Sequence, residues 1–274
     1  MKTLLKIEWL KVKNYTAFKV ISIFFAVGIF ATNYIFYYFK KNVIDKADPT
    51  GFLSSGSPFA FPKVWLTVSY YSGCILILPS LLLLMLVTNE FTYRTSRQNI
   101  IDGLSRKQFI DVKLMSGTIL ALASTILVFI TAVIFGFIIG GDFSFVGIEN
   151  LGYFFLKAIT YNFVAILVSV LVRRTGFAIA MFFIYTAIEN GLSLFLFGCA
   201  ISIKEDHKID LGNMGNYLPM NASDGLLYSP FATLTKIAGN KLPADYTWLV
   251  FTLAICYLAL FFLWAKRNFI KRDM

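Results

Sequence analysis

The sequence predicts an all-α integral membrane protein with six transmembrane helices and one N-terminal helix at the membrane surface. Of its 274 residues, 58% are hydrophobic and only 15% are charged, so a single soluble core could not bury its apolar surface. The charged residues are also collected between apolar runs of about 20 residues, the length of a transmembrane helix, whereas soluble helices repeat them at the helical period. We therefore expect one membrane domain over residues 1–274.

The first stretch of the chain predicts an amphipathic helix that lies in the membrane interface. Lys2, Lys6 and Lys13 fall within about 40° of one another on a helical wheel, and apolar residues cover much of the remaining circumference. Glu8 and Lys11 interrupt the apolar arc. A basic tail that does not form a helix is the alternative.

Six apolar runs follow, each long enough to cross the roughly 30 Å hydrocarbon layer at about 1.5 Å per residue. Pro79 lies inside the second run and predicts a kink there. The basic pair Arg173 and Arg174 forms a tight turn, which makes the fourth and fifth spans antiparallel neighbours. The expected divisions are a surface helix over 1–15, spans over 17–39, 64–88, 114–139, 151–172, 177–203 and 247–265, a cytoplasmic loop over 89–113 and an extracytoplasmic loop over 204–246.

Basic residues fall mainly on one side of this topology. The side that holds both termini, the 89–113 loop and the arginine turn carries sixteen of the 25 basic residues and five acidic ones, while the rest of the chain carries nine basic and ten acidic residues. Lysine and arginine concentrate on the cytoplasmic side of membrane proteins. We therefore expect both termini in the cytoplasm and the lipid bilayer as a partner. Nucleic acid is not expected as a partner, because topology explains the basic charge.

Few residues that carry catalysis or bind metals are present. Cys74, Cys199 and Cys256 all lie in apolar runs, which is typical of small core residues, and His207 is the only histidine. Zinc sites with two histidines therefore cannot form. The chain has no G-x-x-x-x-G-K-[ST] segment, so ATP and Mg would have to bind to another chain. We expect no enzyme activity, no catalytic residue, no bound cofactor and no metal in this chain.

The polar segment 89–113, NEFTYRTSRQNIIDGLSRKQFIDVK, interrupts the apolar runs and predicts a structured hairpin. From Phe91 to Ile101 its residues follow a helical spacing. Gly103 is suited to the positive φ that ends a helix, and Ser105 is suited to cap the next one. The alternative is a charged loop held at the lipid surface.

Two ionisable residues lie inside apolar runs, where a bare charge costs at least about 2.5 to 3.5 kcal/mol. Glu189 is near the centre of the fifth span and Lys157 is near the start of the fourth. Folding the two spans about the arginine turn places residue 189 within about 4.5 Å of rise from the level of Lys157, which allows an ion pair. The alternative is that Glu189, with Asn162 and Asn190, lines a polar path for a substrate or an ion.

Taken together, these features resemble the permease subunits of bacterial ABC-2 type ABC transporters, also described as type V exporters. The resemblance rests on the basic helix KIEWLKVK, the six spans, the pattern E-x-x-x-x-T-x-R from Glu90 through Thr95 and Arg97, and the turn Gly-Leu-Ser-Arg-Lys. It covers essentially the whole chain. This sequence has Gly103 and Leu104 before its Ser-Arg pair, where the family often has a proline.

The resemblance implies that the 89–113 loop is a coupling helix in a cleft of a separate ATPase subunit, with residues 1–15 as a connecting helix beside it. Its arginines would form charge-assisted hydrogen bonds with the ATPase, and its large apolar side chains would fill the cleft. The residues expected at this contact are Glu90, Phe91, Arg94, Thr95, Arg97, Ile101, Leu104, Arg106 and Phe109.

The function implied is export across the bacterial cytoplasmic (inner) membrane. Two permeases, identical or paralogous, would work with two ATPase subunits, and the substrate would be amphipathic or lipid-like, for example an antimicrobial peptide. A secondary transporter or channel that uses Glu189 in an ion-coupled path is the alternative. A membrane-bound enzyme is disfavoured, because the spans lack deep aspartates and the chain has one histidine.

Overall fold

The computed structural model describes residues 2–44, 46, 57–139, 142–230, 243–244 and 246–271. Within these ranges every regular element is a helix, which agrees with the predicted all-α class. In chain order the elements are α1 (Lys2–Lys13), α2 (Thr16–Phe39), η1 (Lys40–Ile44), α4 (Val64–Gly73), α5 (Ile77–Thr92), α6 (Thr95–Ile101), α7 (Arg106–Ile138), α8 (Glu149–Val172), α9 (Thr175–His207), η2 (Met214–Tyr217), α10 (Asn221–Asp224) and α12 (Thr247–Lys271).

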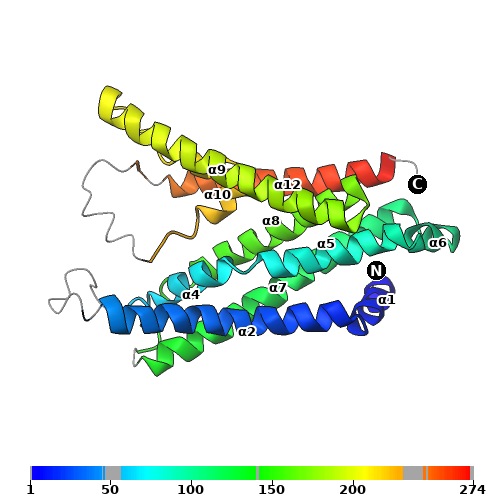
Figure 1. The fold of residues 1–274 in the computed structure, drawn as a ribbon, viewed down its shortest axis with the longest axis horizontal. Coiled ribbons are helices and arrows are strands. Elements are labelled where there is room, and N and C mark those ends of the chain that lie inside the picture. The colour runs from blue at the N-terminus through cyan, green and yellow to red at the C-terminus, as the bar shows by residue number, and fades with distance from the viewer. Residues whose placement is uncertain are drawn as a thin grey trace.

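The long helices lie along one common axis (Figure 1). Among the described residues, five helices are long and apolar enough to cross a membrane, and the bent pair of α4 and α5 supplies a sixth span. Each predicted span therefore coincides with one long helix or with this pair, and the protein is embedded in a membrane. Figure 1 also shows α6 and both chain ends at the same end of the bundle.

The second span is bent, as predicted from Pro79. α4 ends at Gly73 and α5 begins at Ile77, and the two helices meet at 44°. Pro79 lies in the first turn of α5, where its missing N–H removes no intrahelical hydrogen bond. Its ring would collide with the carbonyl of Ile75 in a continuous helix. The break therefore falls on the N-terminal side of the proline.

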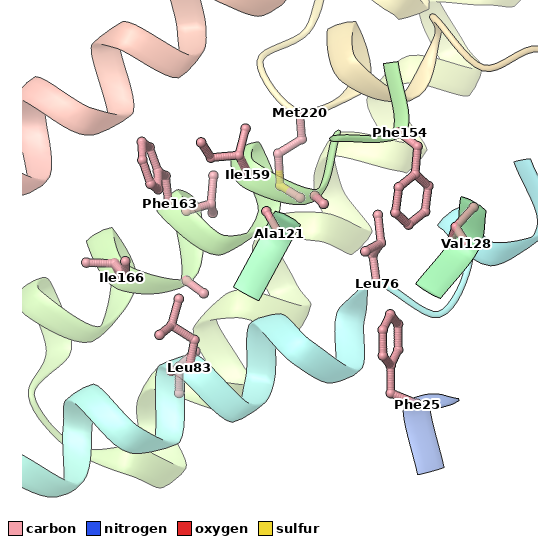
Figure 2. Packing of buried hydrophobic residues seen from close by; sticks show 14 of the residues in the cluster. Phe25, Leu76, Leu83, Ala121, Val128, Phe154, Ile159, Phe163, Ile166 and Met220 are labelled. Carbon is pink, nitrogen blue, oxygen red and sulfur yellow. The ribbon is translucent and has the colours of Figure 1, made fainter. Parts of the chain in front are cut away.

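α8 is the central helix of the bundle. Of its apolar 18-residue stretch 67% is buried, against 11% for α9 and 17% for α2. Ile166 of α8 and Leu83 of α5 belong to the same buried core (Figure 2), while the Phe163 ring of α8 packs on Phe262 of α12 with ring centroids 6.0 Å apart. A Cβ added to Gly117 of α7 would lie 3.2 Å from both Ile166 and Leu83. The absence of a side chain at Gly117 thus lets α5, α7 and α8 approach closely, as small residues do in membrane bundles.

The segment expected as an extracytoplasmic loop over 204–246 is partly folded into the bundle. α9 continues to His207, and the chain then turns back through η2 and α10. Met220, Ala222 and Leu226 are buried among α8, α9 and α12. Residues 231–242 and 245 of this loop lie outside the described residues.

Candidate functional site at the α6 end of the bundle

The hairpin between α5 and α7 is built from two sharp turns around α6. Arg94 adopts a left-handed conformation with φ of 58°, which turns the chain from α5 into α6. The Thr95 hydroxyl donates a hydrogen bond to the carbonyl of Glu90 at 3.3 Å, which satisfies a carbonyl near the end of α5. Gly103 has φ of 99°, so the predicted glycine turn is confirmed.

A capping box connects this hairpin firmly to α7. The Ser105 side chain accepts a hydrogen bond from the backbone N–H of Gln108 at 3.2 Å, and the Gln108 side chain accepts one from the Ser105 N–H at 3.0 Å. This arrangement confirms the predicted cap and satisfies N–H groups that the helix leaves open. α7 consequently starts at Arg106, before the predicted span start at residue 114, and continues without interruption to Ile138.

Several of the residues expected to contact a partner lie on the surface of the hairpin. Arg94, Thr95 and Arg97 are exposed, and Ile101 is 77% exposed. Leu104 is half-buried. These residues form a surface with both positive charge and an apolar anchor.

Arg106 and the arginine turn join the hairpin to the other helices at this end. Arg106 Nη1 donates a hydrogen bond to the carbonyl of Ile270, near the end of α12, at 3.2 Å. Arg173, from the turn between α8 and α9, lines a cavity of about 180 Å³ together with Arg94 and Arg97. The structure thus adds Arg173 to the basic residues that sequence reasoning selected.

Three of the expected contact residues point into the bundle instead. Phe109 is 2% exposed and stacks on Phe269 of α12, with ring centroids 4.9 Å apart. Phe91 lies 6.2 Å from the Phe269 ring and 5.6 Å from the Arg173 guanidinium carbon. Glu90 is 9% exposed. The Phe109 side chain is therefore buried against α12, which ends beside the hairpin. It cannot enter the cleft of a partner subunit, although the sequence led us to expect that it would.

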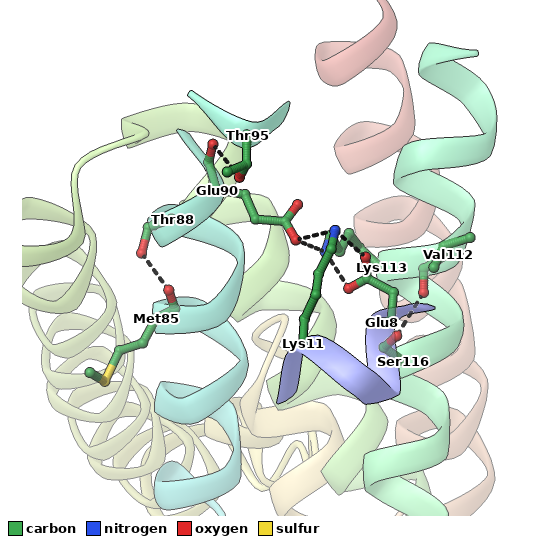
Figure 3. A network of polar contacts seen from close by, with 9 residues as sticks. All are labelled: Glu8, Lys11, Met85, Thr88, Glu90, Thr95, Val112, Lys113 and Ser116. Carbon is green, nitrogen blue, oxygen red and sulfur yellow. Dashed lines mark hydrogen bonds and ion pairs between the residues drawn. The ribbon is translucent and has the colours of Figure 1, made fainter. Parts of the chain in front are cut away.

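Glu90 belongs to a cluster of four charged residues that we call the α1 cluster: Glu8, Lys11, Glu90 and Lys113 (Figure 3). Buried Lys113 of α7 donates to Glu90 Oε1 at 2.7 Å and also to Glu8 Oε2. Lys11 Nζ lies 3.2 Å from Glu8 Oε1 and 3.2 Å from Glu90 Oε1. The cluster connects α1 to both α5 and α7.

The electrostatics of the α1 cluster favour its charged form. Burial opposes the charge of Glu8, but the ammonium groups of Lys113 and Lys11 outweigh it and lower the pKa of Glu8. Burial likewise opposes the charge of Lys11, and the carboxylates of Glu90 and Glu8 outweigh it and raise the pKa of Lys11. The lowered pKa of Glu8 and the raised pKa of Lys11 both favour the ion pairs that hold α1.

Sequence reasoning selected Glu90 but missed the other three members of the cluster. The available signal was the interruption of the apolar arc of α1 by Glu8 and Lys11, which are three residues apart and so share a helix face. Lys113 gave no such signal, since it stands at the edge of an apolar run. Only packing shows that it is 3% exposed.

The polar residues in the middle parts of α8 and α9 do not pair as expected. Lys157 forms an ion pair with Asp224 of α10 at 3.3 Å, and the Tyr161 hydroxyl donates to Asp224 Oδ2 at 2.9 Å. Glu189 Oε1 instead accepts from the backbone N–H of Asn221 at 2.9 Å and from that of Met220. The expected Lys157–Glu189 pair is therefore corrected: α10 folds between α8 and α9 and supplies a partner to each.

We call Lys157, Tyr161, Glu189 and Asp224 the α10 cluster. Asn162 lies elsewhere: it donates to the carbonyl of Gly117 at 2.8 Å and accepts from Ser80 at 3.1 Å, which ties α8 to α7 and α5. Asn190 is exposed on α9. The residues expected to line one polar path thus take part in separate contacts.

Within the part of the chain that the structure describes, no group of three or more His, Cys, Asp or Glu side chains gathers as a metal site would need. Comparison with known protein families and with curated proteins finds no match for this chain. Its function has to be inferred from its geometry.

Proposed function

We propose that this chain is the membrane-spanning permease subunit of an ATP-driven exporter of the ABC-2 type. The observation that supports this most is the α6 hairpin, which lies at one end of the bundle and is joined to two spans, through the left-handed turn at Arg94 and through the capping box of α7. In this proposal a separate ATPase subunit, which binds ATP and Mg, docks on the hairpin.

The hairpin has the mechanical connections that such a role requires. α7 has 33 residues and so extends about 50 Å at the rise of an α-helix. If a bound partner displaced α6, α5 and α7 would tilt with it. The capping box and the turn at Arg94 leave few backbone bonds that can rotate between α6 and these two helices. The α1 cluster would transmit the same displacement to α1.

The exposed side chains of the hairpin suit a protein contact. Arg94 and Arg97 can form bidentate hydrogen bonds with carboxylates of a partner, and Ile101 can enter an apolar pocket. The excess of basic residues at this end supports a cytoplasmic location for it, in a bacterial cytoplasmic membrane.

The second permease, a copy or a paralogue, would cover α9 and α2, whose apolar stretches have the smallest buried shares among the unbroken spans of the described chain. Asn190 supports this placement, because an exposed amide in an apolar helix gains from a hydrogen bond to a neighbouring helix. The apolar surfaces of these helices favour an amphipathic or lipid-like substrate, such as an antimicrobial peptide.

The geometry supports a structural role for Glu189 more than an ion-coupled path. Its Oε1 atom already accepts backbone hydrogen bonds from Met220 and Asn221, and Lys157 has its own partner in Asp224. An ion-coupled transporter would need Glu189 to exchange its partners during each cycle.

The test is a pull-down of the tagged protein from mild detergent, followed by an ATPase assay on the eluate. We expect a soluble ATPase to co-elute, and we expect Arg97→Glu with Ile101→Ala to weaken its retention at least about tenfold, the loss typical of two contact residues. Ile101 is chosen over Phe109, another large apolar residue expected at the contact, because Phe109 is buried.

Arg174→Glu is the matched control, since Arg174 is an exposed arginine at the same end of the bundle but outside the hairpin. It should retain the ATPase. Elution of the protein without an ATPase, or full retention and coupling by the double variant, would contradict the proposal.

A further inference from the structure

An apolar groove lies beside the α1 cluster, between α1, α2, α5 and α7. Its volume is about 380 Å³ and its walls include Trp9, Phe25, Leu83, Ile119 and Leu120. Most of its lining residues are apolar, and water is stable in a cavity only where it finds polar partners. We call this cavity the tail groove.

The tail groove has the depth of one membrane leaflet. On α7 its lining extends from Ser116 to Leu127, which are about 16 Å apart along the helix axis. One leaflet contributes about half of the roughly 30 Å hydrocarbon layer. A single acyl chain that stands in its own leaflet therefore matches the groove in length and in polarity.

A second cavity, of about 400 Å³, adjoins the tail groove on the side of α6 and shares Glu8, Val12 and Leu86 with it as walls. Along α5 the lining changes from Leu86 to Asn89 and Glu90 as the helix approaches α6. We call this cavity the head pocket. The second cavity therefore adds charged and polar side chains, Lys11, Asn89 and Glu90, at the end of the apolar groove.

The charges around the head pocket are of both signs. The Lys11 side chain is 37% exposed, so its ammonium group can reach a ligand while it contacts Glu8 and Glu90. Glu90 is 9% exposed, and its Oε2 atom is buried without any hydrogen-bond partner in the described structure. Buried carboxylate oxygens are normally hydrogen-bonded, so this atom can accept a hydrogen bond from an N–H or O–H group of a ligand.

We propose that the tail groove and the head pocket form one binding site for a phospholipid whose headgroup carries a primary amine. The phosphate contacts Lys11, the amine donates to Glu90, and one acyl chain fills the tail groove. This inference does not depend on an ATPase partner. It concerns the face of the bundle around α1, and the hairpin surface of α6 is separate from it.

The contacts proposed with Lys11 and Glu90 disfavour two other common phospholipid headgroups. A choline headgroup has a quaternary nitrogen, which cannot donate a hydrogen bond to Glu90. A glycerol headgroup can donate an O–H group to Glu90, but it carries no ammonium charge to pair with the carboxylate, and the lipid keeps a net negative charge beside Glu8 and Glu90. The site therefore selects the amine headgroup over both.

Native mass spectrometry of the detergent-purified full chain tests the site. Phosphatidylethanolamine, phosphatidylcholine and phosphatidylglycerol with identical acyl chains are added separately at equal concentration. We expect the first phosphatidylethanolamine molecule to bind about tenfold more tightly than either other lipid, since the headgroup contacts are charge-assisted hydrogen bonds. Equal binding of the three lipids, or preference for phosphatidylglycerol, overturns the proposal.

A pair of variants locates the lipid. Ala123→Phe places a ring in the tail groove from an exposed position on α7, and Ala180→Phe places the same ring on the exposed surface of α9, away from the groove. We expect Ala123→Phe to abolish the headgroup preference and Ala180→Phe to keep it. Unchanged preference in Ala123→Phe overturns the assignment of the groove. The headgroup comparison on the unmodified protein remains decisive if Ala123→Phe does not fold.

Discussion

The two buried polar clusters, one at the α6 end of the bundle and one deeper along it, use different kinds of partner. In the α1 cluster every contact joins a carboxylate to an ammonium group. In the α10 cluster only Lys157 and Asp224 form an ion pair, while Glu189 accepts from backbone N–H groups and Tyr161 donates to Asp224. Removing one charge from the α1 cluster therefore leaves an opposite charge without its partner. In the α10 cluster, neutral hydrogen-bond donors still contact the carboxylates.

The surroundings of the clusters also differ. Cavities of about 360 Å³ and 400 Å³ adjoin the α1 cluster on two sides, so α1 is held by charge contacts more than by packing. Near the α10 cluster the chain is packed closely: a Cβ on Gly215 would lie 2.5 Å from the carbonyl oxygen of Ser193. The comparison indicates that α1 can move when its charges change, while η2 and α10 are a fixed part of the bundle.

The largest effect is expected from Lys113→Met. Lys113 is 3% exposed and neutralises Glu8 and Glu90, so its loss leaves two carboxylates without their main partner. Breaking a buried charge pair from one side costs about 3–5 kcal/mol. Thermal unfolding in detergent measures this loss.

Lys107→Met on the same helix is the control, because Lys107 is exposed. It should change the free energy of unfolding by no more than about 0.5 kcal/mol. A Lys113→Met variant as stable as Lys107→Met would remove the distinction between the two clusters.

A smaller effect is expected from Glu189→Gln. The amide oxygen can still accept from Met220 and Asn221, but hydrogen bonds to a charged acceptor are stronger, so we expect a loss of about 1–2 kcal/mol. Transport activity in vesicles should be retained. Glu149→Gln, at an exposed position, is the control. Lost transport with unchanged stability would instead favour an ion path through Glu189.

The smallest effect is expected from acid. Because the folded pKa of Glu8 is lowered, its contribution to stability is present above its ordinary pKa of about 4.3 and is lost as the pH falls through the folded value. The pKa of Lys11 is raised, so its contribution is present below about 10.4 and is lost only at higher pH. α1 should therefore stay bound at neutral pH and loosen below about pH 4.

A spin label at Leu10, an exposed position on α1, would report this loosening as increased mobility. The label requires replacement of the free cysteines Cys74, Cys199 and Cys256. Glu8→Gln should remove the acid transition. A transition of equal size in Glu8→Gln would show that Glu8 is not its cause.

Much of the α6 hairpin could be predicted from local sequence. Gly103 and Ser105 form the turn and the cap expected of them, because these features depend on residues within one helical turn. The surface exposure of Arg97 and Ile101 agrees with their predicted position on a projecting helix. The burial of Phe109 could not be predicted, since its partner Phe269 is distant in the chain.

The sequence by itself determined the helical membrane class, the positions of the spans and the local turns, because apolar run length, helix caps and glycine conformation act over a few residues. Only the tertiary structure decided which charges meet. Asp224 reaches Lys157 because α10 folds back between two spans, and Glu8 reaches Lys113 because α1 lies against α7. Such pairings depend on how helices distant in the chain pack together, and local sequence patterns do not predict that packing.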